Sequence, residues 1–165
     1  MELQYSKPFI EATVLVCHRV LELQIFPKTP SAVHSFAPKH FVTGTLSVHG
    51  DLDGTIAFGM DRVFALRATQ LLMRHKANGV DATVVDVVGE LTNQIAGAAR
   101  ARMNSVKLDV SFPEVICGVS KPIPFPSNAK RVTYPFSSLW GNISVDFGFS
   151  SQDAPLRSAK AYSDR

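Results

Sequence analysis

A predicted helical segment carries the side chains in this sequence that are best spaced for chemistry. At about 100° per residue, one stripe of that segment is polar and comprises Asp86, Glu90, Asn93 and Gly97. A carboxylate and a carboxamide one turn apart therefore point the same way, into solvent, beside a glycine that leaves room for another backbone. Gly89 and Gly97 each cost roughly 1 kcal/mol relative to Ala in a helix interior. A helix that contains both glycines indicates close approach of another backbone on that face.

The same pattern has an ordinary structural interpretation. A Glu-x-x-Asn spacing occurs by chance in roughly one chain in three of this size, and a solvated polar face is typical of an amphipathic helix. Asp86 fits a structural or rim position better than a catalytic one. The spacing alone therefore nominates Glu90 and Asn93 as candidate site residues without identifying a reaction.

Helical periodicity predicts the elements that must position this stripe. Three helices are expected, at residues 6–23, 61–75 and 81–103. Ser6 is expected to cap the first helix, with Pro8 in its first turn, and Asp61 to cap the second. The third helix carries the polar stripe, and its opposite stripe is apolar at Val84, Val88, Leu91, Ile95 and Ala98. That apolar stripe predicts burial against a core.

Alternating residues and turn chemistry predict the strands. Five are expected, at residues 41–49, 55–60, 106–117 (interrupted at Pro113), 131–136 and 139–149. The first two form a hairpin around the turn 51–54. The proline-containing segment 24–39 is expected to be an irregular connection. The sequence therefore predicts one α/β domain of the α+β kind over residues 1–150, with a mainly antiparallel sheet and a polar tail at 151–165.

Composition excludes several classes of protein. Hydrophobic residues make up 45% and charged residues 19% of the 165 residues, which excludes wholesale disorder. No apolar run approaches the roughly 18 to 20 residues of a membrane span, and the first residues do not resemble a secretion signal, so a cytoplasmic protein is expected. The net charge of +3 is too small and too scattered to favour a nucleic-acid partner.

The remaining reactive residue types form no second site in the sequence. Cys17 and Cys117 sit among apolar neighbours and are expected to be small core residues. The five histidines show no ligand spacing, so no metal site is expected. The phenylalanines Phe112, Phe125 and Phe136 are expected in the core or at a dimer interface.

The polar stripe and its neighbours resemble the signature helix of the CheC/CheX/FliY phosphatases of bacterial chemotaxis. In that family an acidic or serine residue leads into Glu-x-x-Asn, a stretch of small residues with a glycine follows, and a proline lies further on. The matching positions here are Asp86, Glu90, Asn93, Gly97 and Pro113. Residues 9–13, the hairpin around Gly54 and the strand after Trp140 are also similar to CheX, so that the resemblance covers roughly residues 6–149.

The resemblance implies a CheC-like fold of duplicated helix-and-hairpin units around one sheet. The first helix offers Glu11 but has Val14 where a second asparagine would be, which implies the single-site, CheX-like type. It also implies a homodimer, for which the terminal strand 139–149 is a plausible edge to pair.

The function implied by the resemblance is hydrolysis of the aspartyl-phosphate of a CheY-type response regulator. Asn93 would orient the attacking water, and Glu90 would dock the lysine of the regulator. Asp86 and Gly97 would lie at the binding rim. The protein would need no cofactor of its own, because Mg²⁺ would belong to the regulator.

Two other functions stay open at this stage. A dimeric module with this fold could bind a regulator or another signalling partner without turnover. A flagellar-switch role, as in FliY-type relatives, is disfavoured because no appended domain is visible in the sequence. The sequence does not identify the regulator or its pathway.

Overall fold

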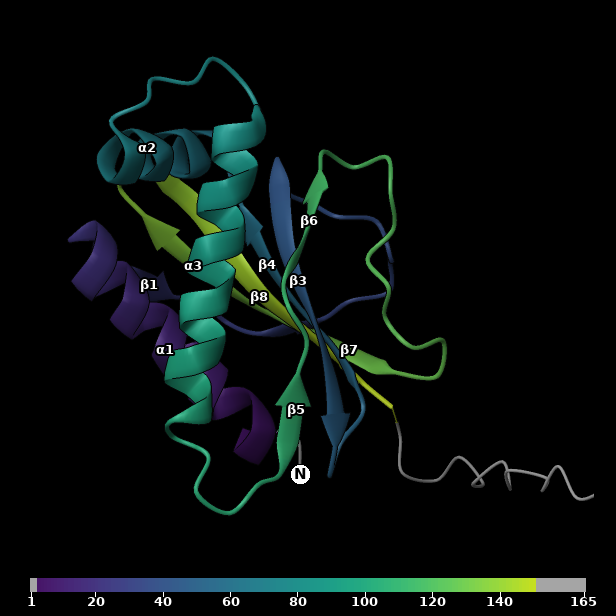
Figure 1. Ribbon diagram of the computed structural model, residues 1–165. Helices are drawn as coiled ribbons and strands as arrows, with labels where there is room; N and C mark the ends of the chain where they lie inside the picture. The colour runs from purple at the N-terminus through teal and green to yellow at the C-terminus, as the bar shows by residue number, and fades with distance from the viewer. Residues whose placement is uncertain (1–2, 151–165) are drawn as a thin grey trace, which may run out of the picture.

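An antiparallel sheet carries three helices on one of its faces in the computed structural model, which describes residues 3–150 (Figure 1). The helices are α1 (Leu3–Leu21), α2 (Arg62–Met73) and α3 (Ala82–Arg100). The strands are β1 (Phe26–Pro27), β2 (Ser31–Ala32), β3 (Val42–Gly50), β4 (Gly54–Met60), β5 (Leu108–Val110), β6 (Glu114–Cys117), β7 (Lys130–Ser138) and β8 (Gly141–Phe149). The predicted tail at 151–165 lies outside the described residues.

The sheet is built from two similar halves. Its strand order is β1-β7-β8-β4-β3-β5, with β2 paired to β7, β6 paired to β3 and every pairing antiparallel. Helix α1 precedes the hairpin β3–β4 and helix α3 precedes the hairpin β7–β8, which confirms the predicted α+β class and the duplicated units. The prediction that the terminal strand is a free edge is wrong, because β8 is paired with β4 on one side and β7 on the other.

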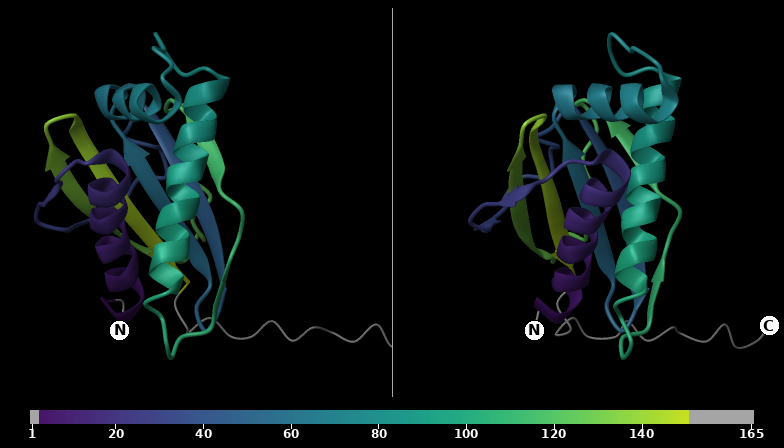
Figure 2. Two further views of the ribbon diagram at one scale, coloured as in Figure 1. Left: turned by 60° about the vertical axis from the view of Figure 1, so that its left-hand side comes forward. Right: turned by 90° about the vertical axis from the view of Figure 1, so that its left-hand side faces the viewer.

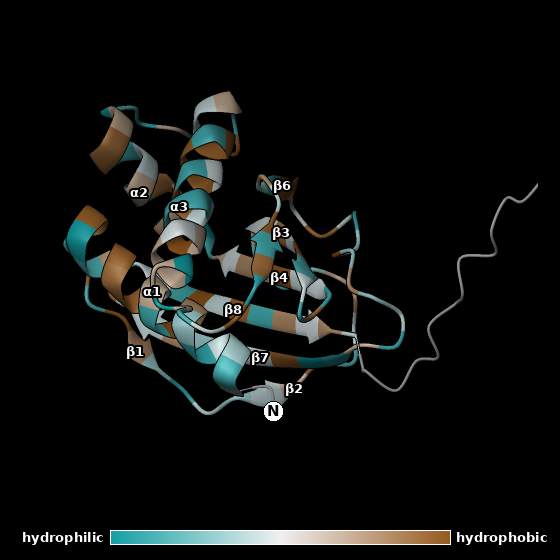
Figure 3. Ribbon diagram, turned by 60° about the horizontal axis from the view of Figure 1, so that its bottom comes forward, coloured by the Kyte–Doolittle hydropathy of each residue, from teal (hydrophilic) through white to brown (hydrophobic). Residues whose placement is uncertain are grey.

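The core lies between the sheet and the helices. The register places Ile56 opposite Phe147 and Phe58 opposite Val145, and all four side chains are buried. Helices α1 and α3 lie side by side over this surface, and α2 crosses near one end of them (Figure 2). Figure 3 shows hydrophilic and hydrophobic residues alternating along these helices, as expected for helices with one buried face.

Two irregular segments pack against the other face of the sheet. Ile123 and Phe125 form a small second core with Ala57 of β4 and Ile116 of β6. The amide of Ile123 also donates to the carbonyl of Phe36 (2.8 Å), which joins the segment before β3 to the segment before β7. These segments therefore cover part of the face opposite the helices.

Two sequence predictions about the first forty residues need correction. Helix α1 already includes Leu3, so Ser6 is buried inside the helix and does not cap it. Pro8 lies in the helix interior and not in the first turn. The segment 24–39 is not wholly irregular, because Phe26–Pro27 and Ser31–Ala32 both pair with β7. Pro27 is tolerated because it sits on an edge strand.

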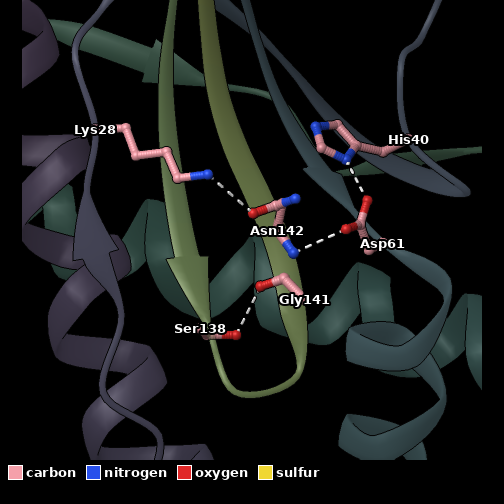
Figure 4. Close-up of polar contacts among 6 residues, drawn as sticks. All are labelled: Lys28, His40, Asp61, Ser138, Gly141 and Asn142. Atoms are coloured by element: carbon pink, nitrogen blue, oxygen red, sulfur yellow. Dashed lines mark hydrogen bonds and ion pairs between the residues drawn. The ribbon is translucent and has the colours of Figure 1, made fainter.

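The Asp61 side chain does not cap α2 as predicted, although the residue occupies the cap position. Its carboxylate instead accepts hydrogen bonds from the backbone N–H of Asn142 (2.8 Å) and contacts Nδ1 of His40 at 3.0 Å (Figure 4). The Asn142 carboxamide accepts a bond from Lys28 at 3.3 Å. Asp61 therefore fastens the start of α2 to the β7–β8 hairpin and to the segment before β3.

The two cysteines differ in environment. Cys17 is buried on the inner side of α1, as predicted, and burial raises the pKa of its thiol to about 12, which keeps it protonated and unreactive. Cys117 is exposed at the end of β6, so its prediction as a core residue is wrong. Its neighbour Ile116 is buried on the opposite face of the sheet, since adjacent residues of a strand face opposite sides.

Asp146 is a carboxylate buried in the middle of β8. Only 9% of the residue is exposed, and its Oδ1 has no hydrogen-bond partner among the described residues. Burial raises the pKa of Asp146, an effect partly offset by hydrogen bonds from Thr133 and Ser144. The ionised form of this side chain therefore destabilises the fold.

We expect Asp146→Asn to stabilise the protein increasingly as the pH rises. Because the folded-state pKa lies above the unfolded value of about 3.9, the wild type loses stability as the pH rises through the folded pKa, whereas asparagine does not ionise. Urea unfolding of both proteins across that range measures the difference. The exposed Asp109→Asn is the control, and a gain that does not vary with pH would contradict this account.

Candidate functional site

Helix α3 starts at a well-defined cap. The Asp81 carboxylate accepts a hydrogen bond from the backbone N–H of Val84 (2.9 Å), and its other oxygen lies 2.7 Å from Nε2 of His75. The contact with His75 is the main cause, and the bond from Val84 the second, of the lowered pKa of Asp81. The cap fixes where α3 begins and therefore the direction of every side chain along it.

The rotation of α3 is set by its buried side. Val84, Val88, Leu91 and Ile95 are buried, as the sequence predicted. Thr92 is also buried, and its hydroxyl donates to the carbonyl of Val88 (2.7 Å). A Cβ atom built on Gly44 of β3 would overlap this hydroxyl, so glycine at that position allows α3 to lie close to the sheet.

The predicted polar stripe faces solvent. Asp86, Glu90, Asn93 and Gly97 are all exposed, and they follow one another along the outer surface of α3. The Asn93 carboxamide has no hydrogen-bond partner within residues 3–150, so that its donor and acceptor are both available to an external group. The structure thus brings together the four residues that the sequence singled out.

Gln94 is a neighbour of the site that sequence reasoning missed. Its Nε2 donates to Oε1 of Glu90 at 3.0 Å, one helical turn apart. One carboxylate oxygen of Glu90 is therefore engaged and the other is accessible. The i,i+4 spacing of Glu90 and Gln94 in a predicted helix was the sequence signal that could have predicted this hydrogen bond.

The two glycines of α3 have different surroundings. A Cβ atom on Gly89 would lie 3.8 Å from Val115 Cγ2, an ordinary contact with β6. A Cβ atom on Gly97 would meet nothing within 4 Å. Packing within the described chain therefore gives no reason for glycine at position 97, although glycine there weakens the helix.

The corresponding surface of α1 offers different chemistry. Glu11 lies 3.8 Å from Lys7 and 4.0 Å from Arg102, so its carboxylate is surrounded by cations of this chain. Val14, one turn later, is partly exposed and supplies no hydrogen-bonding group. Within residues 3–150, only α3 presents an exposed Glu-x-x-Asn pair.

No group of three or more His, Cys, Asp and Glu side chains that could hold a metal ion occurs within residues 3–150. Three of the histidines instead contact single aspartates, in the pairs His40–Asp61, His49–Asp53 and His75–Asp81. In that same part of the chain, no helix is both long and apolar enough to cross a membrane.

A family model described as chemotaxis phosphatase CheX matches residues 42–137. This chain belongs to the CheX family. The matched region begins at β3, includes the whole of α3 and ends in β7, so that Glu90, Asn93 and Pro113 all lie within it. No curated protein matches the chain.

Solved structures of CheX and CheC-like proteins share the fold. A CheC-like superfamily protein from Shewanella sp. PV-4 is 23% identical over 92% of this chain and 100% of its own, with a TM-score of 0.81. CheX from Vibrio vulnificus is 26% identical over 88% of this chain and 99% of its own, with a TM-score of 0.78. A complex of CheX with CheY, BeF3 and Mg²⁺ from Borrelia burgdorferi aligns at 22% identity, 89% and 98% coverage, and a TM-score of 0.72.

We expect Gly97→Ala to stabilise the isolated CheX-family protein by about 0.5–1 kcal/mol, because alanine lowers the cost of forming the helix and its methyl group meets open space. Urea unfolding monitored by circular dichroism measures the change. A loss of stability would show that position 97 is packed in solution. Gly44→Ala is the opposite control, since its methyl group would overlap Thr92 and should destabilise the protein.

Proposed function

We propose that this protein hydrolyses the aspartyl-phosphate of a CheY-type response regulator. The proposal rests on the outward-facing Asn93 carboxamide, one turn from Glu90, in a chain of the chemotaxis phosphatase CheX family. The Borrelia burgdorferi relative of the same fold was solved with CheY, BeF3 and Mg²⁺, which is consistent with a regulator as the partner.

In this proposal Asn93 orients the attacking water. Phosphoryl transfer to water needs an in-line nucleophile and little covalent work from the protein. A carboxamide is not a base near neutral pH, but it can accept a hydrogen bond from a water and donate one to it. Because Asn93 is held on a helix and has no partner within residues 3–150, it can hold a water in a near-attack geometry over the phosphoryl group.

Glu90 docks the regulator by pairing with its lysine. Its accessible carboxylate oxygen takes the lysine ammonium, while the bond from Gln94 limits the motion of the carboxylate. Removal of one partner of such a pair costs about 2–5 kcal/mol where binding desolvates it and little at a wet rim. Glu90 therefore contributes to affinity, and Asn93 to the chemical step.

The rest of the stripe forms the rim of the contact. Gly97 leaves open space in which the backbone of the regulator can approach α3, and Asp86 lies at the acidic end of the stripe. Mg²⁺ belongs to the regulator, so this chain supplies no metal ligand to the reaction. We also propose a homodimer with two equivalent sites, one on each copy.

A binding module without turnover is the competing function. Such a module needs the exposed surface of α3 but has no physical need for a carboxamide free to hold water. Asn93 therefore favours hydrolysis over docking alone.

We expect wild-type protein to accelerate decay of a Mg²⁺-loaded, phosphorylated CheY-type regulator from the same cell, and Asn93→Ala to lose about 100-fold or more of that acceleration. Loss of phosphorylated regulator over time measures both. Asn93→Ala should still bind the regulator loaded with BeF3⁻ and Mg²⁺, because the substitution removes the water-orienting group and leaves Glu90 in place.

Glu90→Gln is the complementary variant and should weaken binding more than it slows the bound reaction. Gln70→Ala, exposed on α2, is a matched surface control that should change neither quantity. Acceleration that survives Asn93→Ala would contradict the assigned mechanism. Binding without acceleration by the wild type would favour the docking module.

A further inference from the structure

Phe112 is an exposed aromatic residue between β5 and β6, with 90% of its surface accessible. The sequence predicted it in the core or at a dimer interface, and the core assignment is wrong. Phe125 and Phe136, predicted in the same way, are buried. The exposure of Phe112 has a specific structural cause. Strands β5 and β6 together form the edge strand beside β3, and their pairing with β3 is irregular between them.

The edge strand contains one extra residue at this point. Val48 of β3 pairs with Val110, and Thr45 pairs with Glu114. Two residues of β3 therefore lie opposite three residues of the edge strand, 111–113, which is the pattern of a β-bulge. Bulges next to functional sites re-aim a side chain that regular pairing would have placed on one face of the sheet.

Hydrogen bonds hold the bulge in shape. The amide of Ser111 donates to the carbonyl of Ser47 (2.9 Å), and the Ser111 hydroxyl accepts from the amide of Ser47 (2.9 Å). The same hydroxyl donates to the carbonyl of Phe112 (3.0 Å). Pro113 follows and restricts the backbone of Phe112 to extended conformations. These contacts hold the backbone that carries the exposed Phe112 ring in one conformation.

The bulge lies beside the site helix, level with Asn93. At one end of the edge segment, Leu108 and Asp109 line a surface depression together with Arg100 of α3. At the other end, Val115 lies against Gly89 of α3. The segment therefore runs antiparallel to α3 from Arg100 to Gly89, as the ribbons of β5, β6 and α3 show (Figure 1). Phe112 is about halfway between these two contacts along the segment, and Asn93 is near the middle of the matching stretch of α3, so the two residues are at about the same level.

The position of Asn93 on α3 brings it toward this flank. At about 100° per residue, Asn93 lies about 40° from Gly89 around the helix, whereas Glu90 lies about 100° from Gly89, on the side of Gln94. The edge strand contacts the Gly89 side of α3. Phe112 and Asn93 therefore share one flank of the site, and Glu90 lies on the other.

We infer that Phe112 is a hydrophobic anchor for the response regulator, an inference that rests on the proposed function. A standard protein interface buries about 800 Å² on each partner, equivalent to a circle of about 16 Å radius. A regulator whose phosphoryl group reaches Asn93 covers the flank on which Phe112 stands. Aromatic residues near the centre of an interface contribute a large share of binding energy. In this inference the ring of Phe112 packs against an apolar patch that lies beside the phosphorylation site of the regulator.

The test compares Phe112→Ala with Leu139→Ala, a matched control at the distant β7–β8 turn where the side chain is 92% exposed. The probe is the CheY-type regulator loaded with Mg²⁺ and BeF3⁻, and its dissociation constant is measured by titration calorimetry. We expect Phe112→Ala to weaken binding about tenfold or more and Leu139→Ala to change it less than about twofold. Phe112→Leu should recover most of the affinity.

Turnover separates this inference from the proposed function. With phosphorylated regulator, Phe112→Ala should raise KM about tenfold and leave kcat within about twofold, unlike Asn93→Ala, which lowers kcat. Equal affinities of Phe112→Ala and Leu139→Ala would overturn the anchor while leaving the phosphatase activity standing. If the wild type binds the regulator without turnover, the proposed phosphatase activity is overturned. The dissociation constants of Phe112→Ala and Leu139→Ala would then still test the anchor.

The oligomeric state distinguishes the regulator from a second copy of this chain as the occupant. Sedimentation of the wild type and Phe112→Ala should show the same self-association. Weaker self-association in Phe112→Ala with unchanged regulator affinity would overturn the inference and assign Phe112 to an interface between copies. Failure of the wild type to bind the loaded regulator would overturn both proposals.

Discussion

The close packing of α3 on the sheet is the constraint on which the surface chemistry depends. Thr92 fits against the bare backbone of Gly44, and the apolar stripe around it is buried. A helix seated this closely has one rotation available, because any other would expose apolar residues or bring Thr92 into overlap with β3. The outward direction of Glu90 and Asn93 is therefore a consequence of what lies beneath the helix.

The two halves of the fold present different surface chemistry on helices that occupy similar places. Helices α1 and α3 occupy similar places before similar hairpins, and each carries an exposed glutamate. On α1 that glutamate lies among cations of its own chain and is followed by Val14. On α3 it is followed by an amide with no partner within residues 3–150. The difference lies in a few surface residues, whereas the buried residues that shape the fold are comparable in kind.

Local patterns were sufficient to predict what depends on one element at a time. The buried and exposed stripes of α3 were predicted because helical periodicity sorts them without reference to the rest of the chain. The short strands in segment 24–39 were not predicted, since they exist only as partners of β7, a hundred residues later. The role of Asp61 depends on His40 and Asn142, and the exposure of Phe112 depends on register. None of these is visible from neighbours in sequence.

The edges of the sheet have a consequence for the behaviour of the protein at high concentration. The outer long strands, β7 and β3, are each lined by two short neighbours in place of one continuous strand. One of these borders contains Pro27 and the other is broken by the bulge at 111–113. Within residues 3–150 the sheet therefore presents no long, straight row of free backbone groups onto which a foreign strand could add. Addition of a foreign strand to this sheet is therefore disfavoured, which protects a concentrated solution of the protein against fibrous aggregation.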